Sequence, residues 1–282
     1  MTVLTQAARA VGRPVHAHTS RWWRRTLLTR AADGTALVAG RRLMVLSPHP
    51  DDETLGCGAL MARARAAGDE VSVVVVTDGR HSTASTVLGP AQLAELRTDE
   101  LRLACKTLGV GDGEVVQLNR EDGTLRGCVS ELADELVTLI TERRPEVVLV
   151  TCAQDNHPDH EALHHALLLA LRRLPGDGPP VPAVLAYPVW TWMNGPWFAE
   201  AERGRRRGLL AWAVRQLGAR GWVEVPCGPH LRAKQSAVAA YASQTTNLTG
   251  EPSWSYLPPE SVSLFLQPSE IFLPVPGRGP AR

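Results

Sequence analysis

Along this chain, short apolar runs typical of strands alternate with longer segments whose apolar residues recur at helical spacing. The runs predict strands, and the segments between them predict helices that end at glycines such as Gly68 and Gly109. Strands separated by helices of this length favour right-handed crossovers. We therefore expect an α/β fold of one domain, a Rossmann-like, mostly parallel sheet with helices on both faces. The predicted strands are Leu43–Ser47, Val71–Val76, Glu114–Leu118, Val147–Val150 and Ala183–Tyr187; the predicted helices are Cys57–Ala67, Pro90–Leu108, Cys128–Glu142 and a segment from the 158 region to Arg173.

The pattern is less regular after Tyr187. The aromatic segment Trp190–Phe198 follows neither period, and long irregular loops in compact domains are often functional. Its tryptophans either belong to the core or line the acceptor side of a pocket. Beyond it we expect a helix at Leu231–Tyr241 and two short strands, Val262–Leu266 and Glu270–Leu273.

The chain divides by composition into three parts: a basic N-terminal extension at 1–42, a main domain at 43–273 and a C-terminal tail at 274–282. The extension is rich in arginine, contains the pair Trp22-Trp23 and has Asp33 as its only acid. Two interpretations are open. Either it packs on the domain with its tryptophans buried, or it contacts an anionic partner or a membrane surface.

Charge and cysteine usage exclude several classes of protein. The 30 Lys and Arg residues against 29 Asp and Glu give a net charge of +1, so we expect no nucleic-acid partner and no general attraction to anionic membranes. The five cysteines show no CxxC spacing, which favours a reducing compartment over a disulfide framework. No apolar stretch is long enough to span a membrane. We expect a cytoplasmic protein without stable membrane insertion, and no feature of the sequence indicates an oligomeric state.

Clusters of histidine and carboxylate residues follow two of the predicted strands. The first is Ser47-Pro48-His49-Pro50-Asp51-Asp52-Glu53, and the second is Asp155-Asn156-His157-Pro158-Asp159-His160. Open α/β sheets bind their ligands at the carboxyl ends of strands. Each cluster alone has a structural explanation, because a proline-led helix start recruits Asp and Asn for capping anyway. Their occurrence at two strand ends of one chain favours a shared metal site.

The candidate ligands are His49, Asp52 and His160. Two imidazoles and one carboxylate are typical of catalytic zinc sites that leave a position open. The same set can hold Fe²⁺ or another divalent metal. Zinc is favoured, since nothing in the sequence indicates redox chemistry.

The remaining polar side chains of the clusters are candidates for catalysis. Only one of two adjacent carboxylates in a turn should reach the metal, so Asp51 is free to act as general base toward water. His157 can stabilise a developing oxyanion or protonate the leaving group. We expect Asp159 to orient the His157 ring and keep it cationic.

These motifs resemble those of the PIG-L/LmbE family of zinc-dependent N-deacetylases, which includes N-acetylglucosaminyl-phosphatidylinositol de-N-acetylases. The likeness lies in His49-Pro50-Asp51-Asp52-Glu53 and His157-Pro158-Asp159-His160, with further similarity at Thr77-Asp78-Gly79 and Tyr241-Ala242-Ser243-Gln244. It extends from about Leu43 to Gln244 and leaves the N-terminal extension outside. The resemblance implies the same metal ligands, the same base and the same role for His157.

The resemblance also implies the reaction: hydrolysis of the acetamide of an N-acetylglucosamine-type sugar in a small glycoside, in secondary-metabolite, thiol or glycolipid biosynthesis. It further implies that Arg97 and Asp122 bind sugar hydroxyls, although a solvated helix arginine and a turn aspartate explain them equally well. The alternatives are a sugar-binding protein of the same fold without turnover and a metal-dependent esterase. The presence of Asp51 argues against the first, because a binding protein does not need a base.

Overall fold

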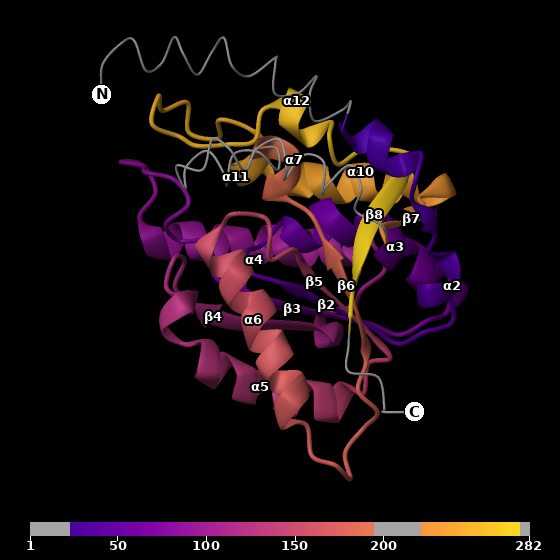
Figure 1. The fold of residues 1–282 in the computed structure, drawn as a ribbon. Coiled ribbons are helices and arrows are strands. Elements are labelled where there is room, and N and C mark those ends of the chain that lie inside the picture. Colours follow the sequence, from indigo (N-terminus) through magenta and orange to yellow (C-terminus); the bar gives the residue numbers. More distant parts are fainter. Residues whose placement is uncertain (1–22, 195–220, 277–282) are drawn as a thin grey trace, which may run out of the picture.

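The computed structural model describes residues 23–194 and 221–276, which form a twisted sheet between two layers of helices (Figure 1). The strand order in this part of the chain is β1-β7-β8-β6-β5-β2-β3-β4. Neighbours from β6 to β4 are parallel, β8 is antiparallel to both β6 and β7, and β1 is parallel to β7. The strands are β1 (Ala32–Asp33), β2 (Leu43–Ser47), β3 (Val71–Thr77), β4 (Val115–Arg120), β5 (Val147–Thr151), β6 (Ala183–Tyr187), β7 (Val223–Pro226) and β8 (Ser269–Val275).

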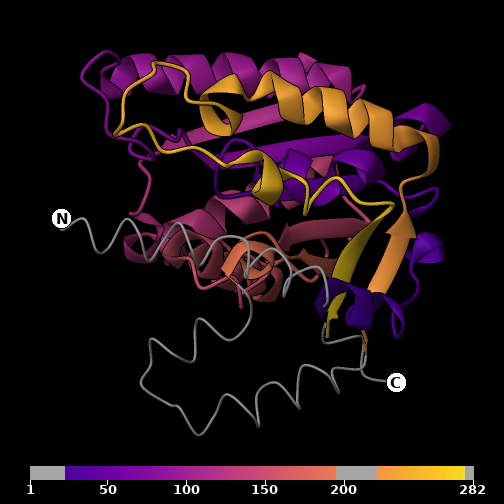
Figure 2. The same ribbon diagram turned by 90° about the horizontal axis from the view of Figure 1, so that it is seen from above.

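Helices cover both faces of the sheet, as Figures 1 and 2 show. One layer contains α3 (Asp52–Ala67), α4 (Pro90–Thr107) and α10 (Leu231–Ala240), and the other contains α5 (Val129–Arg143) and α6 (Pro158–Arg173). Residues 23–28 are also helical. The shorter helices are α2 (Thr35–Val38), α7 (Trp190–Asn194), α11 (Ala242–Thr245) and α12 (Pro259–Val262), with single 3₁₀ turns at Asp112–Glu114, Leu125–Gly127 and Gly228–His230.

Successive side chains of each central strand point to opposite faces of the sheet, so the core has two halves, one on each face. In β2, Leu43 and Val45 face the layer of α3, α4 and α10, while Met44 and Leu46 face α5 and α6. All four side chains are buried. A strand covered by helices on both faces has a continuous apolar sequence. This is why the sequence pattern predicts its position well. The predicted α/β fold with a mostly parallel sheet is confirmed.

The order of the strands places a topological switch point beside β2. This strand lies between β3, which follows it in the chain, and β5. From β5 the chain continues to β6 on the other side, so the connections after β2 and β5 leave in opposite directions. Ligands bind at such switch points in open α/β sheets. The two polar clusters of the sequence follow these two strands.

Several element predictions need correction. Helix α3 begins at Asp52, not at Cys57, because the carboxylates of the first cluster form its first turn. Val262–Leu266 is not a strand; it follows α12 in a series of turns. Strand β7 was not predicted, since its short pattern contains a charge and a proline. The aromatic segment contains α7, and its residues from 195 on lie outside the described part of the chain.

Part of the N-terminal extension packs on the sheet. Trp23 is 3% exposed and lies against Trp192, with ring centroids 5.0 Å apart. The buried Arg24 guanidinium lies 5.2 Å from the Trp192 ring and donates to the carbonyl oxygen of Ser269. Residues 1–22 lie outside the described part, so contact between that arm and an anionic partner stays a prediction. The domain boundaries at 42/43 and 273/274 also stay predictions.

A buried ion pair fixes α3 to the C-terminal third of the chain. The Lys234 ammonium of α10 donates to the Leu55 carbonyl oxygen and to Glu270 Oε1, both at 2.7 Å. Glu270 of β8 also accepts the backbone amides of Ala59 and Leu60 at 2.8 Å. A side chain at Gly58 would crowd the lysine stem, with its Cβ 3.0 Å from Lys234 Cγ. The helix that begins at the first cluster is thus held in place from two later elements.

Within the described residues, no helix combines the length and the apolar character needed to cross a bilayer. The cytoplasmic location stays a prediction.

Candidate metal centre

The first cluster occupies the turn between β2 and α3. Thr77 at the end of β3 holds the turn, because its amide and hydroxyl both donate to the Pro48 carbonyl oxygen, at 2.9 and 2.8 Å. Ser47 donates to the His49 carbonyl oxygen at 2.6 Å. Asp51 precedes the first residue of α3 and has a φ of 125°. The turn projects His49 and Asp52 toward the end of β5.

The second cluster occupies the turn between β5 and α6. His157 caps α6: its Nδ1 accepts the Asp159 amide at 3.3 Å, and Pro158 occupies the first helical position. Proline suits that position because its missing amide would have no helical partner. His157 and His160 lie one turn apart and therefore point to the same side.

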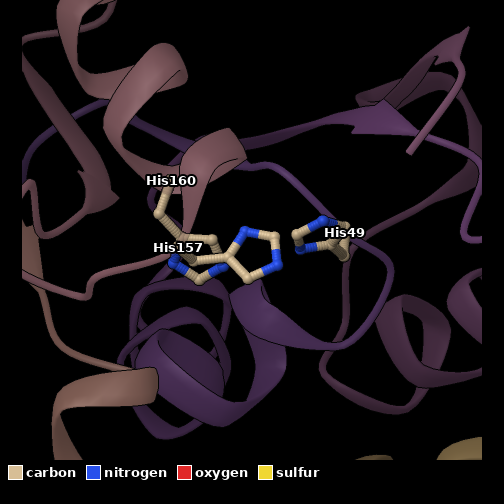
Figure 3. Close-up of side chains that lie close together, drawn as sticks. All are labelled: His49, His157 and His160. Carbon is tan, nitrogen blue, oxygen red and sulfur yellow. The ribbon is translucent and has the colours of Figure 1, made fainter. Parts of the chain in front are cut away.

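The two turns bring three imidazoles together (Figure 3). One ring nitrogen from each of His49, His157 and His160 lies within 4.8 Å of the other two. Asp52 stands between two of the rings, with its Oδ2 3.0 Å from His49 Nδ1 and 3.2 Å from His160 Nε2. The three predicted ligands, His49, Asp52 and His160, therefore converge.

Each of the two ligand histidines contacts a carboxylate through its other nitrogen. His160 Nδ1 lies 2.9 Å from Asp155 Oδ2, and His49 Nε2 lies 3.3 Å from Asp159 Oδ2. Asp155 is fixed in turn by the amides of Val189 and Thr191. A carboxylate on the distal nitrogen fixes the tautomer and orientation of a metal-binding histidine. In the neutral rings, a proton on the distal nitrogen would leave His49 Nδ1 and His160 Nε2 with lone pairs that face Asp52.

These residues fit a divalent cation. His160 Nε2 is buried, and no hydrogen bond of good geometry reaches it within the described residues, although Asp52 is near. Ligand bonds of ~2.0 Å at tetrahedral angles imply edges of about 3.3 Å. The contacts of 3.0 and 3.2 Å from Asp52 to the two imidazoles are close to that value. The nitrogen, nitrogen and oxygen donor set matches the chemistry of zinc and of ferrous iron.

The charges of the site favour a cation. Burial disfavours the charged form of Asp52, but His160 and His49 outweigh it and lower the pKa of this carboxyl. Burial also opposes charge on the rings, yet contacts to Asp159 and Asp52 raise the pKa of His49 to about 10. Asp52 and Asp155 likewise raise the pKa of His160, to about 9, against burial. Carboxylates that stabilise protonated rings stabilise a bound metal ion for the same reason.

The surroundings of His157 differ from our expectation. Burial and the nearby His160 and His49 lower the pKa of His157 to about 4, so its ring is neutral. The Asp159 carboxylate contacts His49 and the amides of Gly123 and Leu125, not the His157 ring. The expectation that Asp159 keeps His157 cationic is wrong, because the helix start turns its side chain toward β2. Since Nδ1 of His157 accepts a hydrogen bond, its proton lies on Nε2.

Trp190 supports His157 from the side. The indole and imidazole planes are inclined by 15°, and their centroids are 5.7 Å apart. Of the tryptophans in the aromatic segment, this one therefore reaches the site, while Trp192 is buried in the core. Trp197 lies outside the described residues.

Asp51 and Arg97 are close enough to interact electrostatically beside the centre. Burial, followed by the charge of Asp52, raises the pKa of Asp51, and Arg97 opposes this shift. Arg97 is 3% exposed, and its buried Nε makes no hydrogen bond within the described chain. Gly79 leaves room for it: a Cβ there would lie 2.6 Å from Arg97 Cδ, and the φ of 72° also favours glycine. A buried guanidinium is thus available beside the site.

Asp122 fixes the loop next to Arg97. Its carboxylate accepts the amide of Gly79 at 3.0 Å and that of His81 at 3.2 Å. These bonds give Asp122 a structural role. Binding of sugar hydroxyls by Asp122 and Arg97 stays a prediction.

Sequence reasoning missed the residues that support the site. Asp155 was seen in the second cluster, but its contact with His160 was not predicted. Glu53 was seen in the first cluster, and Tyr241 and Gln244 were noted only as part of the resemblance, but none of their contacts was predicted. The sequence did contain a signal for these residues, because they adjoin apolar runs. A polar side chain buried there without a hydrogen-bond partner would be costly, so a partner is to be expected. His164, whose Nδ1 lies 3.1 Å from the Thr151 carbonyl oxygen, takes no part in the cluster.

Comparison with known proteins gives a consistent picture. Residues 44–171 match the family model PIG-L, described as GlcNAc-PI de-N-acetylase. The 1D-myo-inositol 2-acetamido-2-deoxy-alpha-D-glucopyranoside deacetylase of Kineococcus radiotolerans is 34% identical over 49% of this chain and 46% of its own length. A similarly named deacetylase of Catenulispora acidiphila is 33% identical over 62% of this chain and 64% of its own. The chain thus spans about half to two thirds of the length of these curated relatives.

Solved structures share the fold. N,N'-diacetylchitobiose deacetylase from Pyrococcus horikoshii superposes with a TM-score of 0.60 at 19% identity, over 83% of this chain and 84% of that protein. GalB, a 4-carboxy-2-hydroxymuconate hydratase from Pseudomonas putida KT2440, superposes with a TM-score of 0.59 at 16% identity, over 86% of this chain and 99% of that protein. One fold therefore carries deacetylation and hydration, and the reaction has to be argued from the site.

Proposed function

We propose that the protein is a metal-dependent N-deacetylase of a small glycoside that carries a 2-acetamido-2-deoxyglucose unit, because residues 44–171 match the PIG-L family model. The observation that carries the proposal is the convergence of His49, Asp52 and His160, with a carboxylate behind each imidazole. The names of the curated relatives support the sugar class. Zinc is the proposed metal.

His49 Nδ1, His160 Nε2 and Asp52 would hold the ion. A divalent cation bound there supplies Lewis acidity, which polarises the amide carbonyl and lowers the pKa of water. Asp51 precedes Asp52 in the chain and is not one of the three proposed ligands. It accepts a proton from the attacking water, whose oxygen bonds to the carbonyl carbon. The C–N bond then breaks, the proton passes to the amine nitrogen, and acetate and a free amine leave.

His157 stabilises the charge that develops on the carbonyl oxygen. Its neutral ring carries the proton on Nε2, which makes it a hydrogen-bond donor toward the site. Stacking on Trp190 fixes the ring plane. Of the two roles considered for His157, this geometry supports oxyanion stabilisation over protonation of the leaving group.

Arg97 is the proposed contact to the sugar. It is a buried cation beside Asp51, and its Nε has no hydrogen-bond partner among the described residues. A guanidinium with an unpaired N–H group is suited to hold the hydroxyls of a substrate.

The test is release of acetate and free amine by metal-loaded protein. The panel contains 2-acetamido-2-deoxyglucosides with different aglycones, among them the inositol glycoside named for the relatives, and O-acetylated sugars as controls. We expect cleavage of N-acetyl compounds only. Cleavage of the O-acetyl sugars alone would identify an esterase instead.

Asp51→Asn separates catalysis from binding. We expect acetate release to fall by at least about 100-fold, because a general base typically contributes that much or more. Zinc content should stay at the wild-type level, since Asp51 is not a ligand. A variant that retains full turnover would contradict the role of Asp51. If neither protein turned over the panel while both bound N-acetyl sugars, the protein would be a sugar-binding member of the fold.

A further inference from the structure

The backbone of Asp51 has a conformation that an aspartate does not favour by itself. Its φ of 125° and ψ of −34° lie outside the regions open to residues with a Cβ atom. Such a conformation persists only where surrounding contacts hold it, and strained residues of this kind concentrate at active sites. The contacts that hold Asp51 should therefore bear on the direction of its carboxylate.

Glu53 holds the amide side of the turn. Its Oε2 accepts the Asp51 amide at 3.1 Å, and its Oε1 accepts the Thr54 hydroxyl at 2.6 Å and the Tyr241 hydroxyl. Both Glu53 and Tyr241 are buried. Tyr241 follows α10, almost two hundred positions later in the chain.

Gln244 of α11 holds the carbonyl side of the same peptide. Its Nε2 donates to the Pro50 carbonyl oxygen. Gln244 is itself held by its neighbour Ser243, whose amide and hydroxyl donate to the two oxygens of Glu100 on α4, at 2.7 and 2.6 Å. The Pro50 carbonyl and the Asp51 amide belong to one planar unit. Holding both groups fixes the orientation of that plane and with it the φ of Asp51.

We propose that Glu53, Tyr241 and Gln244 are positioning residues, which clamp the Pro50–Asp51 peptide and so direct the Asp51 carboxylate into the site. The clamp rests on the proposed function, since Asp51 is the proposed base. It assigns a role to the segment that follows residue 171, where the match to the family model ends. None of the three side chains touches the donor atoms of His49 or His160.

The clamp predicts a separation of kinetic effects. Without it Asp51 relaxes toward negative φ and its carboxylate moves, whereas the ligand set stays. We expect kcat to fall while KM and zinc content keep their wild-type values. Misplacing a catalytic group by about 1 Å typically costs about 100-fold in rate.

Two substitutions at Glu53 test the contact to the amide. Glu53→Gln keeps an oxygen that can accept the Asp51 amide, and Glu53→Met has similar volume but no acceptor. We expect kcat to fall by less than about fivefold in the glutamine variant and by at least about 30-fold in the methionine variant. Equal kcat values in the two variants would overturn the proposal.

A matched pair of tyrosines tests the distal contact. Tyr241→Phe removes the bond to Glu53, and Tyr187→Phe removes an equally buried hydroxyl, which donates to the Leu46 carbonyl oxygen at 2.8 Å. We expect about a tenfold loss of kcat for the first variant and wild-type kcat for the second. An equal loss in both would mean that general destabilisation causes the effect, and the proposal would fall.

A measurement without turnover separates the clamp from the proposed reaction. In zinc-loaded protein containing isotope-labelled aspartate, the Asp51 amide should exchange with solvent at least about tenfold faster in Glu53→Met than in wild type. It should exchange at nearly the wild-type rate in Glu53→Gln. Unchanged exchange in Glu53→Met would overturn the clamp even if the wild type is an active deacetylase. If the wild type releases no acetate, the proposed function fails, and the exchange rates still decide whether the clamp exists.

Discussion

At the scale of single residues, the candidate metal centre includes carboxylates outside the proposed ligand set. Asp155 and Asp159 each contact the distal nitrogen of one of the two proposed ligand histidines. In metal sites, carboxylates in such positions orient the imidazoles and strengthen metal binding. They also explain why the second cluster contains more acids than one ion requires.

Asp155→Asn should weaken metal binding. The groups that contact this carboxylate are donors, among them His160 Nδ1 and the amides of Val189 and Thr191, so an amide nitrogen in its place would face other donors. We expect a loss of zinc affinity of about 10- to 100-fold, measured by competition with a chelator. Asp134→Asn is the control, because Asp134 is an exposed acid paired with Arg173 far from the site. Wild-type affinity in the first variant would refute the assignment.

The sequence predicted which residues converge at the candidate metal centre better than it predicted the contacts that support them. His49, Asp52 and His160 stand in short motifs whose spacing already limits their geometry. Their partners depend on the direction of a turn or on distant segments, as with Asp159 on His49 or Tyr241 on Glu53. No local pattern encodes such contacts, which is why the role expected for Asp159 was wrong.

At the scale of elements, α3 links the site to the rest of the fold. Its first turn carries Asp52, and its middle receives Lys234 and Glu270 from α10 and β8. Close packing against the sheet requires small residues on this helix: a Cβ at Gly56 would lie 2.1 Å from Cδ2 of Tyr187. The position of Asp52, a proposed metal ligand, therefore depends on elements that follow the segment matched by the family model.

Lys234→Met should destabilise the protein strongly. It leaves the Glu270 carboxylate buried without its cation, which typically costs about 3–5 kcal/mol of unfolding free energy. Glu270→Gln alone should also destabilise, and the double variant should lose at least about 1 kcal/mol less than the sum of the two. Urea denaturation of the four proteins gives the coupling. Additive losses would show that the two side chains act independently.

Elements with a continuous apolar run were predicted within a few residues, as for β2, β5 and β6. Such runs come from strands covered on both faces. β7 lies beside the edge strand β1. Its short mixed pattern, like that of Val262–Leu266, does not distinguish strand from turn.

At the scale of the whole molecule, the sheet has two halves. The matched half comes from the segment that matches the family model, and the added half comes from the rest of the chain. Strands β2, β3, β4 and β5 lie within the segment that matches the family model, and β6, β8, β7 and β1 extend the sheet from both sides of that segment in the chain. The added half carries Glu270 and packs against Trp23. The core is therefore shared across both halves.

Trp23→Ala should reduce the unfolding free energy by about 3–5 kcal/mol, because it empties a buried aromatic site. Leu37→Ala, at a side chain that is 45% exposed, should change it by no more than about 0.5 kcal/mol. Thermal and urea denaturation give both values. A chain that starts at Leu43 should lack a cooperative transition; a stable protein of that length would instead support a boundary at 42/43.

Strand β8 follows β7 in the chain but lies between β6 and β7 in the sheet. While the protein is being synthesised, the ribosome has therefore released both neighbours before the strand that joins them exists. Until β8 emerges, two strand edges stay open, and open edges pair readily with other chains. The sheet can become continuous only after β8 enters between β6 and β7, which makes the insertion of β8 a late step of folding.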